Sequence, residues 1–429
     1  MLHLPWVKDM DVDVWTLRDL NFSNSVVLLR VDINSPIDPT TGVILNDYRI
    51  RSHVDTISYL SANDAKVVIL AHQSRPGKDD FTTLEEHAQI LAKYVGHIEY
   101  VDEICSSRVI EKIKTMKPGE IMLLENIRMN SEEMMLENSP VEKQKKALFV
   151  RRLSSVASYY VNDAFAVSHR LQPSVTAFPY LMPSAAGFLM ERELVNLTRV
   201  LRESEGPRVA ILGGAKIDDS IRIVERLLVE CNYERIITGG LVSVLFLYAN
   251  GLKLGRANIE TLAKNSSDLQ RVFETAKGLL ERYRDRILLP NDVAVNKNGI
   301  RHEISLEKAD VIEEPIMDIG FNTIFMYKDE VRRAKVVLVN GPMGAYESPL
   351  FAFGTYEIFN ALAKLNAFKV AGGGHTVSVI EQLRLNRFFD HISTGGGAMI
   401  NFIAGKELPG ISALIDSKKK FSSMKGNVV

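Results

Sequence analysis

One stretch of this 429-residue chain combines residue types that suit an anionic ligand. It runs from Val209 to Ile221 and reads VAILGGAKIDDSI, which is an apolar run, two glycines, a lysine and two carboxylates. This order predicts a buried strand, a tight turn and the start of a helix. Main-chain amides at a helix N-terminus attract anions, so Lys216 would stand where it could meet a phosphate. Taken alone, the stretch is equally compatible with an ordinary strand-to-helix turn.

Similar glycine-rich strand ends recur downstream. The runs IITGG, VVLVNGP, FKVAGGG and HISTGGG end at Gly240, Pro342, Gly374 and Gly397. Parallel strands bring their carboxyl ends to one edge of a sheet, where ligands bind in open α/β folds. Residues 372–376 (GGGHT) and 394–397 (TGGG) are each expected to open a helix and to form an amide nest for anions. The NGPMG turn begins at Asn340. The carboxylate of Glu347, which follows this turn, could accept a hydrogen bond from a ribose hydroxyl.

The first half of the chain carries basic residues where strands are expected to end. The relevant segments are RVDINSP, AHQSRP, LLENIR and NDAFAVSHR, and Arg49 lies at the start of the first long helix. The basic residues are Arg49, His72, Arg75, Arg128, His169 and Arg170. Any one of these is usually a solvated or salt-bridged surface group. Guanidinium groups match carboxylate and phosphate oxygens in pairs, so the set together suits a small, highly anionic ligand. The histidines could instead indicate a metal, but no cysteine or carboxylate spacing supports a closed metal site.

The elements that must position these residues follow from periodicity. The expected strands are Val26–Val31, Lys66–Ala71, Glu120–Leu124 and Ser158–Val161, and helices such as Ile50–Asn63 and Leu84–Val95 fit between them. Strand, helix and strand in this rhythm indicate parallel strands joined by crossovers. One edge of one sheet would therefore present the whole basic set.

A clean helical pattern from Glu191 to Leu201 stands near the middle of the chain. Prolines interrupt regular structure before it, and Glu205, Gly206 and Pro207 end it. We interpret this helix as the connector between two α/β units of similar size. The alternative is a further crossover helix within one large sheet.

Length and composition limit the possible classes of protein. A chain of this length predicts two domains, and 46% apolar with 24% charged residues is ordinary globular composition. Lysine plus arginine (52) balances aspartate plus glutamate (53), so no overall field favours nucleic acid and an anion site must be a local cluster. The run Lys418–Lys420 is interpreted as a solvated face.

The expected location is cytoplasmic. Cys105 and Cys231 have no partner motif, which indicates a reducing compartment. The first residues carry acids where a signal peptide needs an apolar segment, and no apolar run is long enough to span a bilayer. We therefore expect a soluble intracellular protein that binds neither membrane nor nucleic acid.

The common phosphate-binding motifs are missing from this sequence. It contains no G-x-x-x-x-G-K-[ST], no G-x-G-x-x-G after a predicted strand and none of the protein-kinase signatures. One half of the chain is thus suited to a small anion and the other to a nucleotide, but without a P-loop motif or a dinucleotide-binding motif. A dehydrogenase is excluded because the dinucleotide fingerprint is missing.

The motifs together resemble those of one known family, phosphoglycerate kinase, in its archaeal branch. RVDINSP, AHQSRP, LLENIR, NDAF…HR, GGAK, NGPMG…E, GGGHT and STGGGA occur in that family's order and spacing over essentially the whole chain. The resemblance implies reversible phosphoryl transfer between the acyl phosphate of 1,3-bisphosphoglycerate and ADP, giving 3-phosphoglycerate and ATP, in glycolysis and gluconeogenesis. Phosphoryl transfer needs positioning and charge stabilisation more than covalent chemistry, which agrees with the residues found.

The resemblance also implies a fold and its division into domains. It implies two Rossmann-like domains, each a parallel sheet flanked by helices, joined by a hinge helix that lets them close. The expected domains are residues 1–190, which bind 3-phosphoglycerate, and residues 206–407, which bind Mg²⁺ with ATP or ADP. Residues 191–205 would be the connecting helix, and residues 408–429 would pack back on the first domain. We expect a monomer, because two substrate domains must move freely.

The resemblance assigns roles to individual positions. The residues implied to bind 3-phosphoglycerate are Asp32, Ile33, Asn34, Arg49, His72, Gln73, Ser74, Arg75, Arg128, His169 and Arg170. Those implied to bind the nucleotide are Gly214, Lys216, Asn340, Glu347, Gly373, Gly374, His375 and Thr376. Arg49, Lys216 and Gly396 are implied to be catalytic. A pseudoenzyme or binding protein on the same scaffold is the competing class, but Arg49 and Lys216 are both present.

Two positions depart from the usual family pattern. Ser220 stands where most members carry a second lysine, and His375 stands where most carry an aspartate that helps to hold the metal. The first change removes a positive charge and the second a negative one, so we hypothesise that they compensate. The metal ligand is then either Asp219 or only the phosphates and water.

Overall fold

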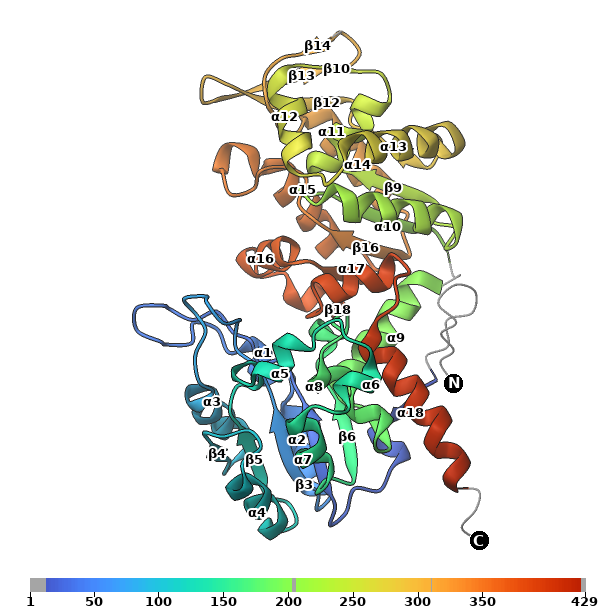
Figure 1. The fold of residues 1–429 in the computed structure, drawn as a ribbon. Helices are drawn as coiled ribbons and strands as arrows, with labels where there is room; N and C mark the ends of the chain where they lie inside the picture. Colours follow the sequence, from blue (N-terminus) through green and yellow to red (C-terminus); the bar gives the residue numbers. More distant parts are fainter. Residues whose placement is uncertain (1–12, 203–205, 310, 426–429) are drawn as a thin grey trace. The chain divides into compact units, whose positions relative to one another are not determined.

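The computed structural model describes residues 13–202, 206–309 and 311–425. These residues form two compact units (Figure 1). Unit 1 contains the described residues up to Val195 and those from Lys406 onward, and unit 2 runs from Asn196 to Gly405. The helix α9 (Phe188–Arg202) contributes residues to both units. It begins three residues before the predicted connector, whose last residues, 203–205, lie outside the described residues.

Unit 1 is an α/β unit built on one parallel sheet. Its strands are β1 (Trp15–Thr16), β2 (Val26–Arg30), β3 (Lys66–Leu70), β4 (Glu99–Val101), β5 (Ile121–Leu124), β6 (Tyr159–Asn162) and β7 (Ser184–Ala186). Its other helices are α1 (Tyr48–Ser52), α2 (Val54–Ala62), α3 (Glu85–Val95), α4 (Ser107–Thr115), α5 (Ser131–Met135), α6 (Val141–Gln144), α7 (Leu148–Ser154), α8 (Pro173–Thr176) and α18 (Pro409–Lys425), with 3-10 turns η1 (Leu17–Asp19), η2 (Ile127–Met129), η3 (Phe165–Val167) and η4 (Phe178–Tyr180). The strand order is β1-β7-β6-β2-β3-β5-β4, and every pair is parallel.

Apolar strands explain why helices cover both faces of this sheet. In β2, Val27 and Leu29 pack against one core cluster with α2 and α3, whereas Leu28 packs into the opposite cluster with α4 and α7. Successive side chains of a strand point to opposite faces, so a strand that is apolar at every position must be buried on both sides. The predicted strands are confirmed to within one residue at each end.

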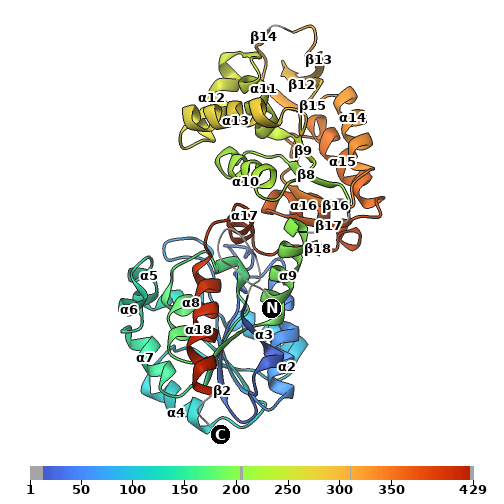
Figure 2. The same cartoon turned by 90° about the vertical axis from the view of Figure 1, so that its right-hand side faces the viewer.

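The C-terminal helix α18 belongs to unit 1. Its Gly410 N–H donates to Ser168 O at 2.9 Å, and Asp416 accepts from the Tyr180 hydroxyl at 2.8 Å. Ile411 and Leu414 on the same helix are fully buried. Figure 2 shows α18 in red alongside α8 of this unit. Burial of these side chains holds the end of the described chain against the first half of the sequence.

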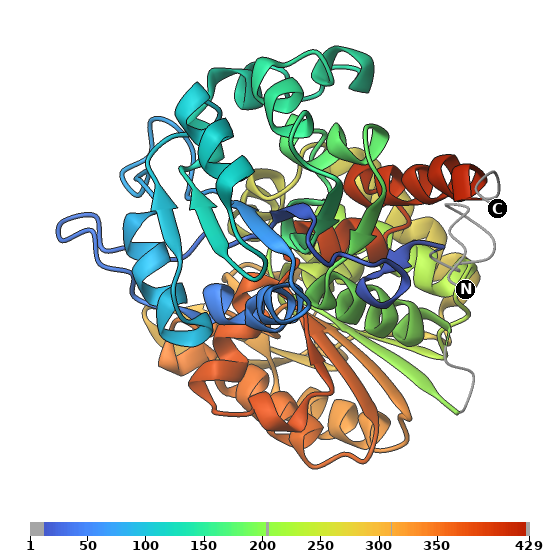
Figure 3. The same cartoon turned by 90° about the horizontal axis from the view of Figure 1, so that it is seen from below.

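Unit 2 contains a second parallel sheet and smaller strand groups. Its strands are β8 (Arg208–Leu212), β9 (Arg235–Thr238), β10 (Lys253–Leu254), β11 (Ile287–Leu288), β12 (Asp292–Lys297), β13 (Ile300–Ser305), β14 (Val311–Ile312), β15 (Ile316–Ile319), β16 (Val336–Asn340), β17 (Phe368–Gly372) and β18 (His391–Ile392). Its helices are α10 (Ile217–Val229), α11 (Gly240–Ala249), α12 (Arg256–Lys264), α13 (Leu269–Tyr283), α14 (Phe321–Val331), α15 (Phe353–Ala363), α16 (Gly374–Gln382) and α17 (Gly397–Ile403), with η5 (Pro349–Phe351) and η6 (Asn386–Phe388). The main sheet has the order β11-β9-β8-β16-β17-β18, and its twisted strands fan out in Figure 3.

An antiparallel sheet in unit 2 was not expected from the sequence. It has the order β13-β12-β15. The turn between β12 and β13 is Asn298–Gly299, and both residues have positive φ, 54° and 81°. Asn-Gly between two strand-forming runs is a strong hairpin signal, because a two-residue type I′ turn needs positive φ at both positions. That dipeptide could have revealed the hairpin.

The structure changes one predicted helix and supports the predicted class of fold. The helix expected over Ile50–Asn63 is interrupted at His53, which separates α1 from α2. The prediction of α/β domains with parallel sheets flanked by helices is confirmed. None of the helices in the described ranges is long and apolar enough to cross a membrane.

Candidate functional site

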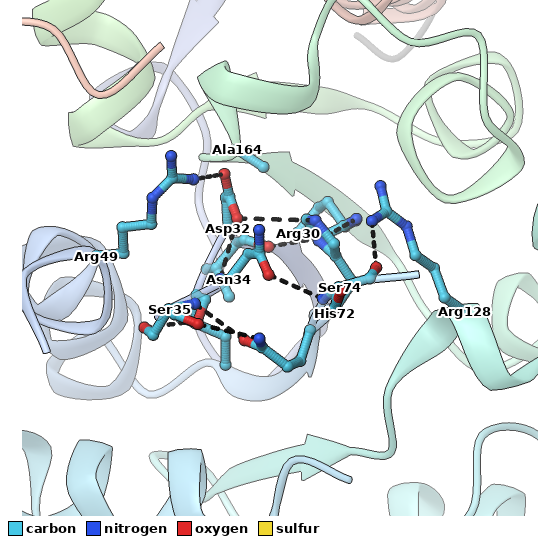
Figure 4. A network of polar contacts seen from close by, with 12 residues as sticks. Arg30, Asp32, Asn34, Ser35, Arg49, His72, Ser74, Arg128 and Ala164 are labelled. Carbon is cyan, nitrogen blue, oxygen red and sulfur yellow. Dashed lines mark hydrogen bonds and ion pairs between the residues drawn. The ribbon is translucent and has the colours of Figure 1, made fainter. Parts of the chain in front are cut away.

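The carboxyl ends of neighbouring strands in unit 1 bring polar side chains together. Strands β6, β2, β3 and β5 are adjacent in the sheet, and the segments after them carry Asp163, Asp32, His72 and Arg128. Figure 4 shows the polar network that several of these side chains form with Arg30 and Arg49. From β2 the chain continues to β3, which pairs with one side of β2, and later forms β6, which pairs with the other side. This reversal creates the type of crevice in which open α/β sheets bind ligands.

Asp32 and Arg49 form an ion pair at this edge. Arg49 Nη1 donates to Asp32 Oδ2 at 2.5 Å, and the Asn34 N–H donates to Asp32 Oδ1 at 3.1 Å. Burial raises the pKa of the Asp32 carboxyl, but Arg49 and the other neighbours outweigh burial and lower this pKa to about 2. The Arg49 side chain remains 35% exposed. Asp32 therefore orients an arginine that still has donors available for a ligand.

His72 is held as a neutral hydrogen-bond donor. Its Nδ1 lies 3.1 Å from Arg30 Nη2, and its Nε2 lies 3.9 Å from Asp32 Oδ1. Because a guanidinium group can only donate, Nδ1 must accept and the ring proton sits on Nε2. Burial and the charges of Arg30 and Arg128 lower the pKa of His72 well below its usual value, although Asp32 opposes them. A neutral Nε2–H donor suits a carboxylate or phosphate oxygen.

Arg30 is a residue whose importance the sequence prediction missed. It stands at the tip of β2, is fully buried, and donates through Nε to Ser174 Oγ at 3.0 Å. Ser174 in turn donates to the buried carboxyl of Glu133 at 2.6 Å. An arginine inside an otherwise apolar strand was the available signal, since fully buried arginine is rare unless it is paired.

Arg128 is a buried arginine at the same sheet edge. It is 4% exposed, and its Nη1 donates to Ser74 O at 2.5 Å. Within the described part of the chain, its Nε and Nη2 have no hydrogen-bond partner, and the same holds for His169 Nδ1 and Arg170 Nε. Burial and neighbouring arginines lower the pKa of Arg128 to about 10, so it stays charged at neutral pH. Buried unpaired donors are costly, and an anion bound at this position would satisfy them.

Other predicted residues brace the loops or lie at the rim. Gln73 is fully buried and exchanges hydrogen bonds with both main-chain groups of Ser35. Asn34 Oδ1 accepts from the Ser74 N–H at 2.8 Å, and Ile33 is buried in the core. Arg75 is exposed, and Arg170 contacts Glu137 at 3.4 Å. The structure thus groups Asp32, His72 and Arg128 closely with Arg49 and leaves Arg75 outside their hydrogen-bond network.

In unit 2 the glycine-rich strand ends converge at the centre of the main sheet. The N–H groups of Gly213 and Gly214 donate to the carbonyls of Asn340 and Pro342 at 2.9 and 2.8 Å. A Cβ atom on Gly213 would lie 2.1 Å from Pro342 O, so no larger residue fits there. The Gly341 N–H donates to Thr376 Oγ1 at 2.7 Å. These contacts join the ends of β8, β16 and β17 where the strand order reverses.

A pocket of about 320 Å³ adjoins this junction. Its lining includes Gly214, Gly240, Pro342, Glu347 and His375. His375 Nδ1 lies 3.6 Å from Glu347 Oε1 and 3.2 Å from the Tyr346 hydroxyl. A mostly apolar pocket lined by a few polar groups is the usual form of a small-molecule site.

The remaining predicted residues of unit 2 lie around helix starts. Lys216 is exposed at the N-cap of α10, and Gly373 and Gly396 are the N-cap residues of α16 and α17. Gly374 is the first residue of α16, so its amide belongs to a helix N-terminus that favours anions. Ser220 is 1% exposed and does not line the pocket.

The residues near Lys216 fit a metal that arrives with phosphates rather than a resident ion. Among residues 13–202, 206–309 and 311–425, no group of three or more His, Cys, Asp or Glu side chains could hold a metal. Asp219 Oδ1 already accepts from Arg222 Nη2 at 2.5 Å. Mg²⁺ usually binds through one or two carboxylates, waters and substrate phosphates, so one carboxylate is enough.

One α/β unit carries a basic cluster that suits an anion, and the other carries a glycine-walled pocket, an arrangement compatible with phosphoryl transfer by positioning and charge stabilisation. Comparison with known proteins identifies the family. The model of the family described as phosphoglycerate kinase matches residues 17–406. The phosphoglycerate kinase of Methanothermus fervidus is 45% identical over 95% of this chain and 98% of its own, and that of Pyrococcus abyssi is 45% identical over 96% and 100%.

A solved structure gives the same result. The crystal structure of phosphoglycerate kinase from Pyrococcus horikoshii is 42% identical, covers 95% of this chain and 100% of its own, and has a TM-score of 0.84. This chain therefore belongs to the phosphoglycerate kinase family, and its activity is that of a kinase which transfers phosphate to a carboxyl group. The resemblance to this family noted in the sequence is confirmed.

Proposed function

We propose that unit 1 binds 3-phosphoglycerate and that the pocket of unit 2 binds ATP or ADP. In one direction, a carboxylate oxygen of 3-phosphoglycerate attacks the γ-phosphorus of ATP, and the bond from that phosphorus to the bridging oxygen of ADP breaks. The products are 1,3-bisphosphoglycerate and ADP, and the reverse reaction serves glycolysis. No protein atom forms a covalent bond in this step, so the residues act by positioning and by charge.

The observation that carries this proposal is the incomplete bonding of Arg128. Its Nε and Nη2 have no partner among the described residues, and its Nη1 links it through Ser74 and Asn34 to the polar network of Asp32 (Figure 4). A ligand with phosphate and carboxylate oxygens would satisfy these donors in pairs. Arg128, His169, Arg170 and Arg75 would hold the phosphate of the acid, and Arg49 would stabilise the phosphoryl group in transfer. Gln73, Ser74, Asn34 and Ile33 support the loops that hold them.

The nucleotide is proposed to bind across the strand ends of unit 2. Its base and ribose would occupy the pocket, with Glu347 accepting from a ribose hydroxyl. The phosphates would lie on the amides of Gly373, Gly374 and Gly396 with Lys216 as a counter-charge, because helix N-termini favour anions. Asn340, His375 and Thr376 would line the turn beneath them. Mg²⁺ would arrive on the nucleotide with Asp219 as its available carboxylate, and it would neutralise phosphate charge.

The test is an assay of the purified chain with ATP and 3-phosphoglycerate, with ADP formation coupled to a visible readout. Turnover should need both substrates and Mg²⁺. Arg128→Ala should raise KM for 3-phosphoglycerate at least ~10-fold and leave KM for ATP nearly unchanged, because the lost donors belong to one site. Arg108→Ala removes an exposed arginine of the same unit and serves as the matched control. Tight binding of both ligands without turnover would make the chain a binding protein on this scaffold.

We further propose that the two units approach one another when both substrates are bound, with α9 as the linking helix. Exclusion of water protects a reactive acyl phosphate from hydrolysis. We propose that the protein works as a monomer in the cytoplasm. Light scattering on a size-exclusion column tests the oligomeric state, and a mass of twice 48.1 kDa would contradict it.

A further inference from the structure

The residue that interrupts the predicted first helix is bonded through both ring nitrogens. His53, between α1 and α2, is 1% exposed. Its Nδ1 lies 2.7 Å from Asp163 Oδ2, and its Nε2 lies 3.1 Å from the main-chain N and 3.1 Å from the main-chain O of Asp32. Asp32 is the residue whose carboxylate pairs with Arg49. His53 therefore joins the end of β6 to the peptide that carries the partner of Arg49.

The bond to Asp163 fixes which ring nitrogen carries the proton. A carboxylate oxygen accepts hydrogen bonds, so Nδ1 of His53 must be the donor. In the neutral ring, Nε2 then carries a lone pair and accepts the Asp32 N–H. If the proton moved to Nε2, the ring could bond only the Asp32 carbonyl. The partner of Nδ1 thus decides which atom of the Asp32 peptide is held.

Asp163 is itself rigidly placed. Its Oδ1 accepts from the Leu189 N–H at 2.9 Å and from the Met190 N–H at 3.2 Å, so it caps the first turn of α9. A Cβ atom on the neighbouring Gly187 would lie 2.2 Å from Asp163 Oδ1, so the glycine makes room for the carboxylate. Because Oδ1 serves the helix, Oδ2 is left for His53. The Asp163 side chain therefore caps α9 and, through His53, also holds Asp32 in position.

We propose that His53 is a positioning residue for phosphoryl transfer. Held as the Nδ1–H tautomer by Asp163, it anchors the Asp32 peptide, and Asp32 in turn aims the guanidinium of Arg49. This inference rests on the proposed role of Arg49 at the transferring phosphoryl group. A group that aligns only the transition-state arginine should affect the transfer rate far more than substrate binding.

Asp163→Asn is the sharpest test, because it keeps the size of the side chain. The amide oxygen must still accept from Leu189 and Met190, so the amide NH₂ faces His53. Nδ1 then has to accept, the proton moves to Nε2, and the Asp32 N–H loses its acceptor. The phosphoryl-transfer rate in single-turnover quench-flow should fall by ~10- to 100-fold, the range expected from a small misplacement of a catalytic group, with both KM values within ~3-fold of wild type.

Further variants separate positioning from folding. His53→Leu should lower the transfer rate similarly, whereas His53→Gln, whose Oε1 can accept the Asp32 N–H, should recover at least ~3-fold of that loss. Thr56→Val is the matched control: Thr56 Oγ1 accepts from the Phe188 N–H at 2.9 Å, so this variant removes a cap of α9 without touching Asp32. It should lower the melting temperature and leave the rate unchanged. In ¹⁵N-histidine spectra, the wild type should show His53 protonated at Nδ1, and Asp163→Asn should show it protonated at Nε2.

The outcomes distinguish this inference from the proposal on which it rests. If Arg49→Ala lowers the transfer rate while folded Asp163→Asn and His53→Leu stay within ~2-fold of wild type, the positioning role is wrong. An Nε2–H tautomer in the wild type would also overturn it. If Arg49→Ala itself leaves the rate unchanged, the role of Arg49 is wrong instead. A slow Thr56→Val enzyme would show that any loss of the helix cap slows transfer, which would also overturn a specific role for His53.

Discussion

In unit 1, the buried charged side chains are held by the residues that contact them and not by solvent. Arg30 and Asp32 are almost completely buried charges: Arg30 donates to the Ser174 hydroxyl, and Asp32 pairs with Arg49. The cost of burying them is offset only while their partners stay in place, which makes the site sensitive to single substitutions. In the described part of the chain, two guanidinium nitrogens of Arg128 have no partner, so ligand binding should be the step that completes its bonding.

Replacing Arg49 by alanine should lower kcat by about 10³-fold in a protein that remains folded, because we propose that the arginine stabilises charge on the transferring group. Arg51→Ala is the control, since Arg51 lies on the same helix, is half exposed and pairs with Asp47. The two variants are compared in the coupled assay. Near-normal turnover of the Arg49 variant would rule out this role.

Asp32→Asn should make stability less dependent on pH. The Asp32 pKa is lowered to about 2 in the folded state from 3.8, so the carboxylate contributes stability above pH 3.8 that is lost as the pH falls through 2. Linkage puts this contribution at roughly 2 kcal/mol at neutral pH. The measured quantity is the free energy of unfolding of both proteins at a series of pH values. A difference that persists undiminished at the acid end would contradict the assignment.

The two substitutions relative to the family pattern can be tested for coupling. Ser220 is buried on α10 and His375 is exposed beside Glu347. If they compensate in charge, Ser220→Lys and His375→Asp should each lower kcat/KM for ATP, and the double variant should recover much of the loss. Coupled sites show interaction energies of ~0.5–3 kcal/mol, whereas independent sites add within ~0.5 kcal/mol. Additive effects would mean that the two changes are unrelated.

At the scale of elements, the antiparallel sheet of unit 2 is tied to the loop that carries Glu347. Arg301 on β13 donates through Nη1 to Asp318 Oδ2 at 2.8 Å and to Leu350 O at 3.0 Å. Asp318 on β15 also accepts from the Gly354 N–H at 2.8 Å. This pair therefore connects the hairpin, β15 and the start of α15 beside the pocket.

Arg301→Met should destabilise unit 2 by ~3–5 kcal/mol at alkaline pH, because it leaves the buried Asp318 carboxylate without its cation. Burial raises the pKa of Asp318 to about 6 even with Arg301 present. Protonation of Asp318 therefore contributes stability below pH 3.8, and this contribution is lost as the pH rises through 6. The destabilisation caused by Arg301→Met should for the same reason shrink in acid. Calorimetric unfolding on both sides of pH 6 measures it.

The double variant Arg301→Met with Asp318→Asn provides the control. It removes the stranded charge and should recover most of the stability lost by the single variant at alkaline pH. Equal destabilisation of the single and double variants would show that packing of the arginine stem, and not the buried charge, is responsible.

At the scale of the whole molecule, chain connectivity links the two units in two places. Helix α9 leads from unit 1 into unit 2, and the chain returns at Lys406 so that α18 packs on unit 1. The anion cluster lies entirely in unit 1 and the pocket entirely in unit 2. With the binding sites proposed above, neither substrate alone would have partners in both units, so the proposed approach of the units should need both.

Small-angle scattering tests this expectation. The radius of gyration should decrease when 3-phosphoglycerate and a non-hydrolysable ATP analogue are both present, and it should change less with either ligand alone. The Arg128→Ala protein at the same ligand concentrations is the control, because its acid site is weakened. An unchanged radius with both ligands bound would contradict closure.

The sequence by itself determined the strands, the glycine turns and the basic residues that follow the strands. These features depend on local periodicity, and a strand such as β2, whose first four residues are all apolar, must be buried on both faces. Carboxyl ends of parallel strands share one edge, so the meeting of Asp32, His72 and Arg128 followed from order along the chain. The Asn298–Gly299 dipeptide also indicates a hairpin, although the hairpin was not among the predicted elements.

Only the tertiary structure decided the partners of the buried polar groups. Asp163 is 110 residues from His53, and Ser174 is 144 residues from Arg30. No local pattern specifies which of many possible partners a side chain meets at such separations. Protonation states follow from the same contacts: the neutral donor form of His72 requires both burial and the neighbouring Arg30. The residue types limited which chemistry is possible. Packing then determined where the protons lie and which donors remain available for that chemistry.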